Sequence, residues 1–201
     1  MKNFFTASNI AKLGIFSALA VILYFLNFPL PFFPPFLEIH LSDLPALICG
    51  FTLGPIGGVL TVVIKILIKL PFSATSFVGE CADLILGIFF VLPASIIYKR
   101  AKTKKSAISG IIIGSLCSIT ASIFANWLVI VPFYTHETLG FTTMETLVKV
   151  CSGIMPFINE SNFYPCYLFL SVLPFNALRC IVVSLITIFV YKRISNLLKR
   201  F

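Results

Sequence analysis

The stretch FPLPFFPPFLEIHLSD, residues 28–43, separates the first hydrophobic segment of the chain from all the others. It contains four prolines, at positions 29, 31, 34 and 35. Because proline lacks an amide donor and breaks helices, this stretch is not part of a membrane span. An ordinary connector is polar, whereas Glu38, His40 and Asp43 are the only ionisable groups here. A stiff, apolar segment between two hydrophobic helices predicts a lid that folds over a cavity and excludes water.

The rest of the chain has the composition of a membrane protein. Of its 201 residues 59% are hydrophobic and 11% are charged, whereas a soluble domain carries about 25% charged residues. Several apolar runs reach the roughly 20 residues that a spanning helix needs. The sequence therefore predicts an all-α integral membrane protein, a single membrane domain over residues 1–201, with six transmembrane helices. These are expected at about residues 8–27, 43–54, 56–70, 78–98, 106–131 and 164–194.

The net charge of +8 is arranged for a membrane and not for nucleic acid. Most of the lysines and arginines flank the apolar runs, near the two termini and in residues 99–105. By the positive-inside rule, both termini and the 99–105 loop are cytoplasmic. The proline-rich lid, the turn at 71–77 and the long segment 133–163 are then external. We expect a multi-pass protein of the plasma membrane, in contact with the lipid bilayer and with no nucleic-acid partner.

No pattern in the chain indicates an enzyme. The motifs GxxxxGK(S/T), HExxH and GxSxG are absent, so we expect no ATPase, zinc-protease or hydrolase site. His40 and His136 are the only histidines, and the six cysteines show no metal-ligand spacing. We therefore expect no metal and no cofactor. Cys151 and Cys166 share the long external segment, and a disulfide between them is left open.

Small residues form a stripe along the first predicted helix. Ala7, Ala11, Gly14 and Ala18 recur at the spacing of one helical face. Small residues let another helix approach closely. The stripe either packs inside the protein or docks a partner membrane protein.

Polar groups inside the predicted spans are the candidates for ligand binding. Asn126 offers a donor and an acceptor together, which suits a heterocyclic edge with adjacent C=O and N–H groups, and Arg179 offers donors only. Phenylalanines of the lid suit a flat apolar ring. The alternative is that both polar groups form interhelical hydrogen bonds. Lys65 and Lys69 end the third helix and Glu80 and Asp83 begin the fourth; these four form structural ion pairs or a proton relay.

Taken together, five stretches resemble the substrate-binding S-components of energy-coupling factor (ECF) vitamin transporters, most closely the riboflavin-specific branch. The first joins FPLPFFPPFL (28–37) to SDLPALI (42–48). The others are LGPIGGV (53–59), VGECADLILG (78–87), NWLVIVPFY (126–134) and LPFNALRCIVVS (173–184). They follow one another over nearly the whole chain.

The resemblance implies a substrate-specific subunit that captures riboflavin from outside and has no ATPase motif of its own. Asn126 matches the asparagine that bonds the flavin ring in the family. Arg179 stands where the family usually has lysine, and Asp83 where asparagine is expected, so the exact flavin, riboflavin, FMN or FAD, stays open. The predicted ligand-binding residues are Phe36, Leu37, Lys65, Glu80, Asp83, Asn126, Trp127 and Arg179.

The resemblance also implies partners: a transmembrane coupling protein, docked on the stripe of small residues, and two cytoplasmic ATPases. Two alternatives remain. One is an S-component for another vitamin. The other is a stand-alone ion-coupled carrier that uses Lys65, Lys69, Glu80 and Asp83.

Overall fold

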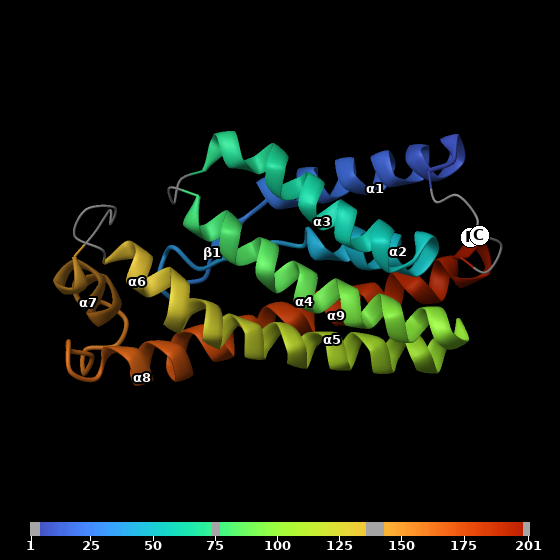
Figure 1. Cartoon of the computed structure of the whole chain (residues 1–201). Coiled ribbons are helices and arrows are strands. Elements are labelled where there is room, and N and C mark those ends of the chain that lie inside the picture. The colour runs from blue at the N-terminus through green and yellow to red at the C-terminus, as the bar shows by residue number, and fades with distance from the viewer. Residues whose placement is uncertain (1–4, 74–76, 136–142, 199–201) are drawn as a thin grey trace.

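The computed structural model describes residues 5–73, 77–135 and 143–198, and these are mostly helical. The long helices run alongside one another in one bundle (Figure 1). The start of α1 and the end of α9 lie at one end of the bundle, and α6, α7 and α8 lie at the other. The helices are α1 (Ala7–Phe25), α2 (Asp43–Leu53), α3 (Pro55–Lys69), α4 (Val78–Ala101), α5 (Lys104–Ala125), α6 (Val131–Tyr134), α7 (Met144–Ser152), α8 (Phe163–Tyr167) and α9 (Leu173–Leu198).

Five helical stretches among the described residues are long and apolar enough to cross a membrane. Helix α2 is shorter: its 11 residues span about 16 Å at a rise of 1.5 Å each. The hydrocarbon core of a bilayer is about 30 Å thick. A sixth full crossing therefore stays a prediction. The five stretches are residues 7–25, 55–72, 78–101, 104–134 and 163–191.

A tight turn separates α2 from α3. Gly54 has a φ of +88°, a conformation that favours glycine, and Pro55 follows as the first residue of α3. Ser42 is the N-cap residue of α2 but makes no side-chain capping hydrogen bond, and Asp43 is the first residue of the helix. Both instead bond the ammonium group of Lys65, so the need to pair a buried charge prevails over the helix cap.

The basic loop expected at 99–105 is much shorter in the structure. Lys99 and Arg100 form the last turn of α4, where cations suit the helix dipole. Helix α5 begins at Lys104, after Thr103 and Ser106 have formed a reciprocal capping box. The connection between the two long helices is therefore only two residues.

Two long helices each contain one turn of π-helix. Segment η2 (Asn126–Ile130) joins α5 to α6, and segment η3 (Leu168–Val172) joins α8 to α9. The chain stays helical through both junctions, so Pro132 does not end the fifth span at residue 131 as expected. Single π-turns inside helices occur frequently at functional sites.

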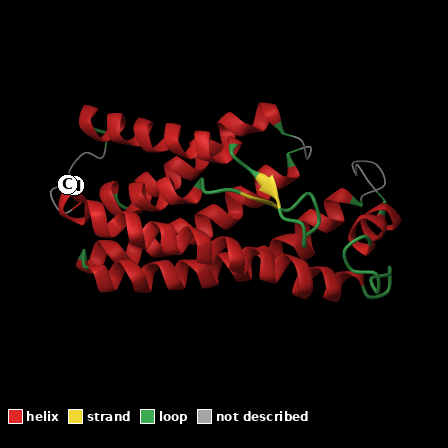
Figure 2. Ribbon diagram, turned by 180° about the vertical axis from the view of Figure 1, so that it is seen from behind, coloured by secondary structure: helices red, strands yellow, loops and turns green. Residues whose placement is uncertain are grey.

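The proline-rich stretch folds back on itself as a small hairpin. Strand β1 (Phe28–Pro29) pairs antiparallel with β2 (Glu38–Ile39), with Phe28 opposite Ile39 and Pro29 opposite Glu38. A short 3-10 turn, η1 (Leu70–Phe72), follows α3. Figure 2 shows the hairpin against the bundle, in the half that carries α7 and α8. No residue of the stretch lies in a membrane-length helix.

The apolar core has two main parts. One fills the bundle between α2, α4, α5 and α9, and includes Leu47, Phe51, Phe90, Tyr98, Ile111, Val183 and Tyr191. The other lies at the opposite end from the termini and joins α6, α7, α8 and η3, with Leu147, Cys151, Met155, Phe163 and Tyr167 among its members. Polar side chains gather between these two apolar regions.

Helices α4 and α5 approach so closely that Gly110 leaves no room for a side chain. A Cβ atom there would lie 2.7 Å from the carbonyl oxygen of Ala94, whereas one at Gly14 would meet nothing within 4 Å. We expect Gly110→Ala to lower the free energy of unfolding by about 1–3 kcal/mol because α4 and α5 must separate. The control Gly14→Ala should raise it by up to about 1 kcal/mol through helix propensity. Thermal unfolding of both variants in one detergent would contradict the packing if Gly110→Ala were as stable as Gly14→Ala.

Candidate functional site

A cavity of about 360 Å³ lies between the hairpin segment and the surrounding helices. Its size falls within the range of small-molecule sites, and its wall combines apolar rings with a few polar groups, as such sites do. Helices α1, α3, α4, α6, α8 and α9 contribute, together with the proline-rich stretch and the π-turn η2. The lining residues are Tyr24, Asn27, Phe36, Leu37, Glu38, His40, Lys69, Gly79, Glu80, Ala82, Asp83, Leu86, Asn126, Ile130, Tyr134, Tyr167, Phe175, Asn176 and Arg179.

Aromatic contacts join the proline-rich stretch to the far wall of the cavity. The ring of Phe36 lies 6.1 Å from the ring of Tyr167, and Phe33 meets Phe175 edge-on at 5.4 Å between centroids. Phe36, Tyr167 and Phe175 line the cavity themselves. The proline-rich stretch thus forms one side of the cavity and contacts its other side through aromatic rings.

Two carboxamides face the cavity from the helices that carry the π-turns. The amide of Asn126 donates to the carbonyl of Ser122 at 2.9 Å, and its oxygen accepts from the Tyr167 hydroxyl at 3.0 Å. Asn176 likewise donates to the carbonyl of Val172 at 2.9 Å. Within the described chain the second N–H of each amide has no hydrogen-bond acceptor. Each remains available to an acceptor on a bound molecule.

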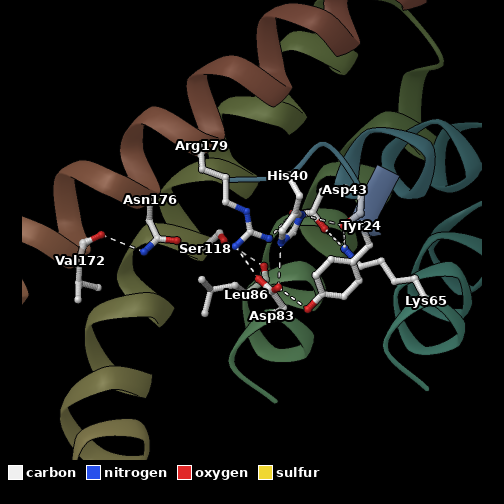
Figure 3. Close-up of polar contacts among 11 residues, drawn as sticks. Tyr24, His40, Asp43, Lys65, Asp83, Leu86, Ser118, Val172, Asn176 and Arg179 are labelled. Carbon is white, nitrogen blue, oxygen red and sulfur yellow. Dashed lines mark hydrogen bonds and ion pairs between the residues drawn. The ribbon is translucent and has the colours of Figure 1, made fainter. Parts of the chain in front are cut away.

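Three side chains from three different elements contact the carboxylate of Asp83 on α4 (Figure 3). Its Oδ2 accepts from the Tyr24 hydroxyl at 2.6 Å and bonds Nε2 of His40 at 2.9 Å. Its Oδ1 pairs with Nη1 of Arg179 at 2.9 Å. The carboxylate therefore holds α1, the lid stretch and α9 against α4.

Asp43 forms a second junction behind the first. Its Oδ1 pairs with Nζ of Lys65 and its Oδ2 with Nη2 of Arg179, at 2.5 and 2.6 Å. The guanidinium of Arg179 thus bridges two carboxylates, as Figure 3 shows. Two acids and two cations balance, so this group of buried charges has no net charge while His40 is neutral.

His40 lies near the end of the proline-rich stretch, between β2 and α2, and is almost completely buried. Burial lowers the pKa of His40 below its ordinary value, against the opposing attraction of the Asp83 carboxylate. Its Nδ1 lies 3.0 Å from Oγ of Ser42. The ring stacks at a tilt on Tyr24, with centroids 4.5 Å apart.

Three other charged residues, Glu38, Lys69 and Glu80, also line the cavity. Glu80 accepts from the hydroxyl of Ser73 at 2.7 Å, and Glu38 pairs with the side chain of Asn27. The ammonium of Lys69 lies 4.4 Å from the ring centroid of Phe25. Carboxylates therefore outnumber cations on the cavity wall.

The structure brings together six of the eight residues expected to bind ligand. Phe36, Leu37, Glu80, Asp83, Asn126 and Arg179 line the cavity. Trp127 does not: it follows Asn126 on the helix, is about half exposed and lies on the outer face of the bundle. Lys65 lies behind the wall, with no exposed surface, and pairs with Asp43 instead of with the acids of α4.

Several lining residues were not predicted. Asn176 lies three residues before Arg179, and that spacing on one helix face is the signal that would have found it. Tyr134 and Tyr167 look like residues of an interfacial aromatic belt, and Tyr24 like an ordinary span residue. His40 belongs to the proline-rich stretch and lies in the cavity wall, against Asp83 of α4.

The stripe of small residues on α1 lies on the surface of the chain. Ala7, Ala11, Gly14 and Ala18 are all exposed. No other described element covers Gly14, since a Cβ there would meet nothing within 4 Å. This leaves an uncovered face of low relief along α1, as a docking surface for another helix requires.

All six cysteines are free thiols in the structure. Cys151 is buried in the apolar cluster around α7, against which Cys166 also packs. Burial raises the pKa of the Cys151 thiol to about 11, which makes it unreactive.

Comparisons with known proteins agree in sequence and in fold. Residues 8–191 match the family model of the ECF transporter, substrate-specific component. Riboflavin transporter RibU of Staphylococcus aureus (strain TCH60) is 33% identical over 189 residues, which cover 94% of this chain and 90% of that protein. Riboflavin transporter FmnP of Bacillus subtilis (strain 168) is 29% identical over 149 residues, 72% of this chain and 78% of that protein.

One solved structure has the same fold. It is described as the structure and mechanism of the S component of a bacterial ECF transporter. The two chains superpose with a TM-score of 0.71 and are 32% identical in sequence. The match covers 94% of this chain and 96% of that one.

Removal of Asp43 tests the pairing of buried charges. In Asp43→Ala, Lys65 loses its carboxylate partner while its ammonium stays buried. We expect the free energy of unfolding to fall by about 3–5 kcal/mol, the usual cost of breaking a buried ion pair. The exposed acid Glu160 provides the control, and Glu160→Ala should change stability by less than about 0.5 kcal/mol. Chemical unfolding in detergent measures both, and equal losses would contradict the pairing.

Proposed function

This chain belongs to the family of substrate-specific components of ECF transporters, and we propose that it captures riboflavin outside the cell for uptake across the plasma membrane. It is a multi-pass membrane protein and a substrate-binding component of a transporter. The observation that carries the choice of ligand is the cavity wall, in which carboxamides face aromatic side chains, in a chain whose relatives are named riboflavin transporters.

The wall suits the two chemical halves of a flavin. Aromatic side chains such as Phe36 and Phe175 offer flat apolar surface to the ring system. The unpaired N–H groups of Asn126 and Asn176 suit the carbonyl oxygens and ring nitrogens at its polar edge. Glu38 and Glu80 on the wall can accept from the hydroxyl groups of a ribityl chain.

The charges of the wall favour riboflavin over its phosphorylated derivatives. The guanidinium of Arg179 is already shared between Asp43 and Asp83, so it has no charge left to neutralise a phosphate. The carboxylates of Glu38 and Glu80 would repel one. Arg179 therefore pairs with carboxylates of the protein itself and not with the ligand. The ligand in this proposal is an uncharged flavin.

We place the end with α6, α7 and α8 outside the cell. The opposite end carries the basic residues around Lys99 and Lys104, as cytoplasmic segments do. Both termini are then cytoplasmic, and the proline-rich stretch is an external lid between the first two of six spans. Its contacts with Tyr167 and Phe175 support this role, because these must break for a ligand to enter.

Energy for uptake comes from other chains in this proposal. The partners are a transmembrane coupling protein and two cytoplasmic ATPases, as the family's place in ECF transporters suggests. We assign docking of the coupling protein to the exposed stripe of Ala7, Ala11, Gly14 and Ala18. The chain itself is then a carrier subunit and not an enzyme, with riboflavin as cargo and no cofactor.

Riboflavin titration tests the ligand and the site together. The ligand-free protein in detergent should quench riboflavin fluorescence saturably. In Asn126→Ala the dissociation constant should rise by about 5- to 150-fold, the equivalent of the 1–3 kcal/mol that an unmet buried polar group costs.

The neighbouring Leu128 is exposed on the outer face, so Leu128→Ala should bind like wild type. Equal affinities of wild type and Asn126→Ala would remove Asn126 from the site. Trp127→Ala tests the expectation from sequence in the same assay, and its position outside the cavity predicts unchanged affinity. A wild-type protein that binds no riboflavin would move the substrate to another vitamin.

Uptake assays test the docking surface. Gly14→Leu adds bulk to the stripe without touching the cavity, so riboflavin binding should persist while uptake in cells is lost. Ile112 is exposed on α5, and Ile112→Trp adds comparable bulk elsewhere, so uptake should persist. Loss of binding in Gly14→Leu would show instead that the stripe packs internally. Uptake by vesicles that contain this chain alone would favour an ion-coupled carrier.

A further inference from the structure

His40 has a bonding partner at each ring nitrogen, and the two partners come from different elements. Nε2 lies 2.9 Å from the Asp83 carboxylate in the cavity wall. Nδ1 lies 3.0 Å from the Ser42 hydroxyl behind the wall. A neutral imidazole carries one proton, so one nitrogen must donate and the other must accept. Which of the two donates decides what His40 presents to Asp83.

Lys65 removes this ambiguity. Its ammonium lies 2.5 Å from Oγ of Ser42 and 2.5 Å from Oδ1 of Asp43. An ammonium group can only donate, so Oγ of Ser42 accepts from Lys65. The single hydroxyl proton of Ser42 is then free for its other neighbour, Nδ1 of His40. Among the described residues Ser42 Oγ has no third partner.

We propose that Lys65 is a positioning residue that acts through Ser42 to fix His40 as the neutral Nε2–H tautomer, a permanent hydrogen-bond donor to Asp83. Hydrogen bonds then run in one direction from Lys65 to Ser42, to His40 and to Asp83. Figure 3 shows the last contact, between His40 and Asp83, with Lys65 next to Asp43. Lys65 itself has no exposed surface and does not line the cavity. Its influence on a bound molecule is therefore indirect.

The opposite tautomer is disfavoured by the same contacts. With the proton on Nδ1, the lone pair of Nε2 would face the carboxylate of Asp83. His40 and Lys65 would both donate to Oγ of Ser42, whose own proton would lose its acceptor. A buried donor without a partner costs about 1–3 kcal/mol. The relay from Lys65 therefore has one consistent direction.

Full protonation of His40 is also opposed. A second proton on Nδ1 would meet the same crowded Ser42 oxygen, and Lys65 and Arg179 lie close enough to repel the added charge. Asp83 alone among the bonded neighbours favours the charged form. The titratable groups that interact with His40 are Tyr24, Asp43, Lys65, Asp83 and Arg179. Glu38, Lys69 and Glu80 line the same cavity.

If His40 stays neutral and keeps its proton on Nε2, the charge of the cavity wall and the hydrogen bond to Asp83 do not change. Tyr24, His40 and Arg179 then all donate to the Asp83 carboxylate. The carboxylate therefore needs no proton or cation from the ligand. The cavity wall therefore favours an uncharged ligand. This consequence for ligand choice rests on the proposed riboflavin site, whereas the tautomer of His40 does not depend on any ligand.

Nitrogen-15 NMR of the imidazole ring tests the proposal in ligand-free protein. His136 is the only other histidine, so His136→Gln in every sample leaves a single ring to observe. We expect a protonated Nε2 and an unprotonated Nδ1, still neutral at about pH 6.5, where an ordinary histidine is half protonated. A protonated Nδ1, or a doubly protonated ring at that pH, would overturn the proposal.

Variants then assign the effect to Lys65. Lys65→Met should give a mixture of tautomers and a larger protonated fraction at about pH 6.5, and Lys65→Arg, which still offers only donors, should restore the wild-type signals. Lys69→Met is the matched control: it removes the other cation of α3, which makes no hydrogen bond to Ser42, and should keep the Nε2–H tautomer.

Ser42→Ala keeps the proposal testable if Lys65→Met does not fold. It leaves Lys65 paired with Asp43 but removes the hydroxyl, so the tautomer preference should be lost as in Lys65→Met. Wild-type ring signals in both variants would show that Lys65 has only a structural role. Riboflavin titration of the same samples tests the proposed function independently of the NMR experiment. If the protein binds no riboflavin, the NMR result still decides the tautomer of His40.

Discussion

The bridge that Arg179 forms between Asp43 and Asp83 is the constraint on which the rest of the structure depends. A charge inside a membrane protein must be paired, and this one is paired twice. Because the acids lie on α2 and α4, a side chain of α9 fixes the relative position of three helices. The lid stretch and α1 join the same junction through His40 and Tyr24, so the cavity wall is formed by charge pairing as much as by apolar packing.

Hydrogen-bond needs also explain why an apolar segment can lie over the cavity. A stretch with four prolines has few amide donors to satisfy, so it can lie over a water-poor site without a full set of partners. A two-residue ladder between Phe28 and Ile39 is enough to close it. Contacts between rings, each weak individually, then join the stretch to Tyr167 and Phe175.

The lengths of the apolar runs and the positions of the prolines predicted the helical fold. A bilayer sets the length that a spanning helix needs, and prolines mark where helices end. The Gly54–Pro55 break and the lid stretch likewise follow from backbone chemistry. Pairing could not be predicted in the same way: Lys65 and Asp43 are 22 residues apart, and nothing in the sequence distinguishes Asp43 from Glu80 as its partner. Asn126 and Trp127 are neighbours in the chain, and only the phase of the helix decides which one faces the cavity. That phase changes at η2, where the sequence gives no warning of a π-turn.

The two π-turns have a consequence for how relatives of this chain differ. Each accommodates one more residue than an α-helical turn of the same height would hold. A single-residue deletion within residues 126–130 or 168–172 would convert the segment to regular α-helix without opening a gap in the backbone. Because the π-turn completes one turn over about the same height with one more residue, such a deletion would leave the side chains beyond it in nearly the same orientation. One-residue gaps in an alignment at these two places therefore mark a lost π-turn and not a lost loop.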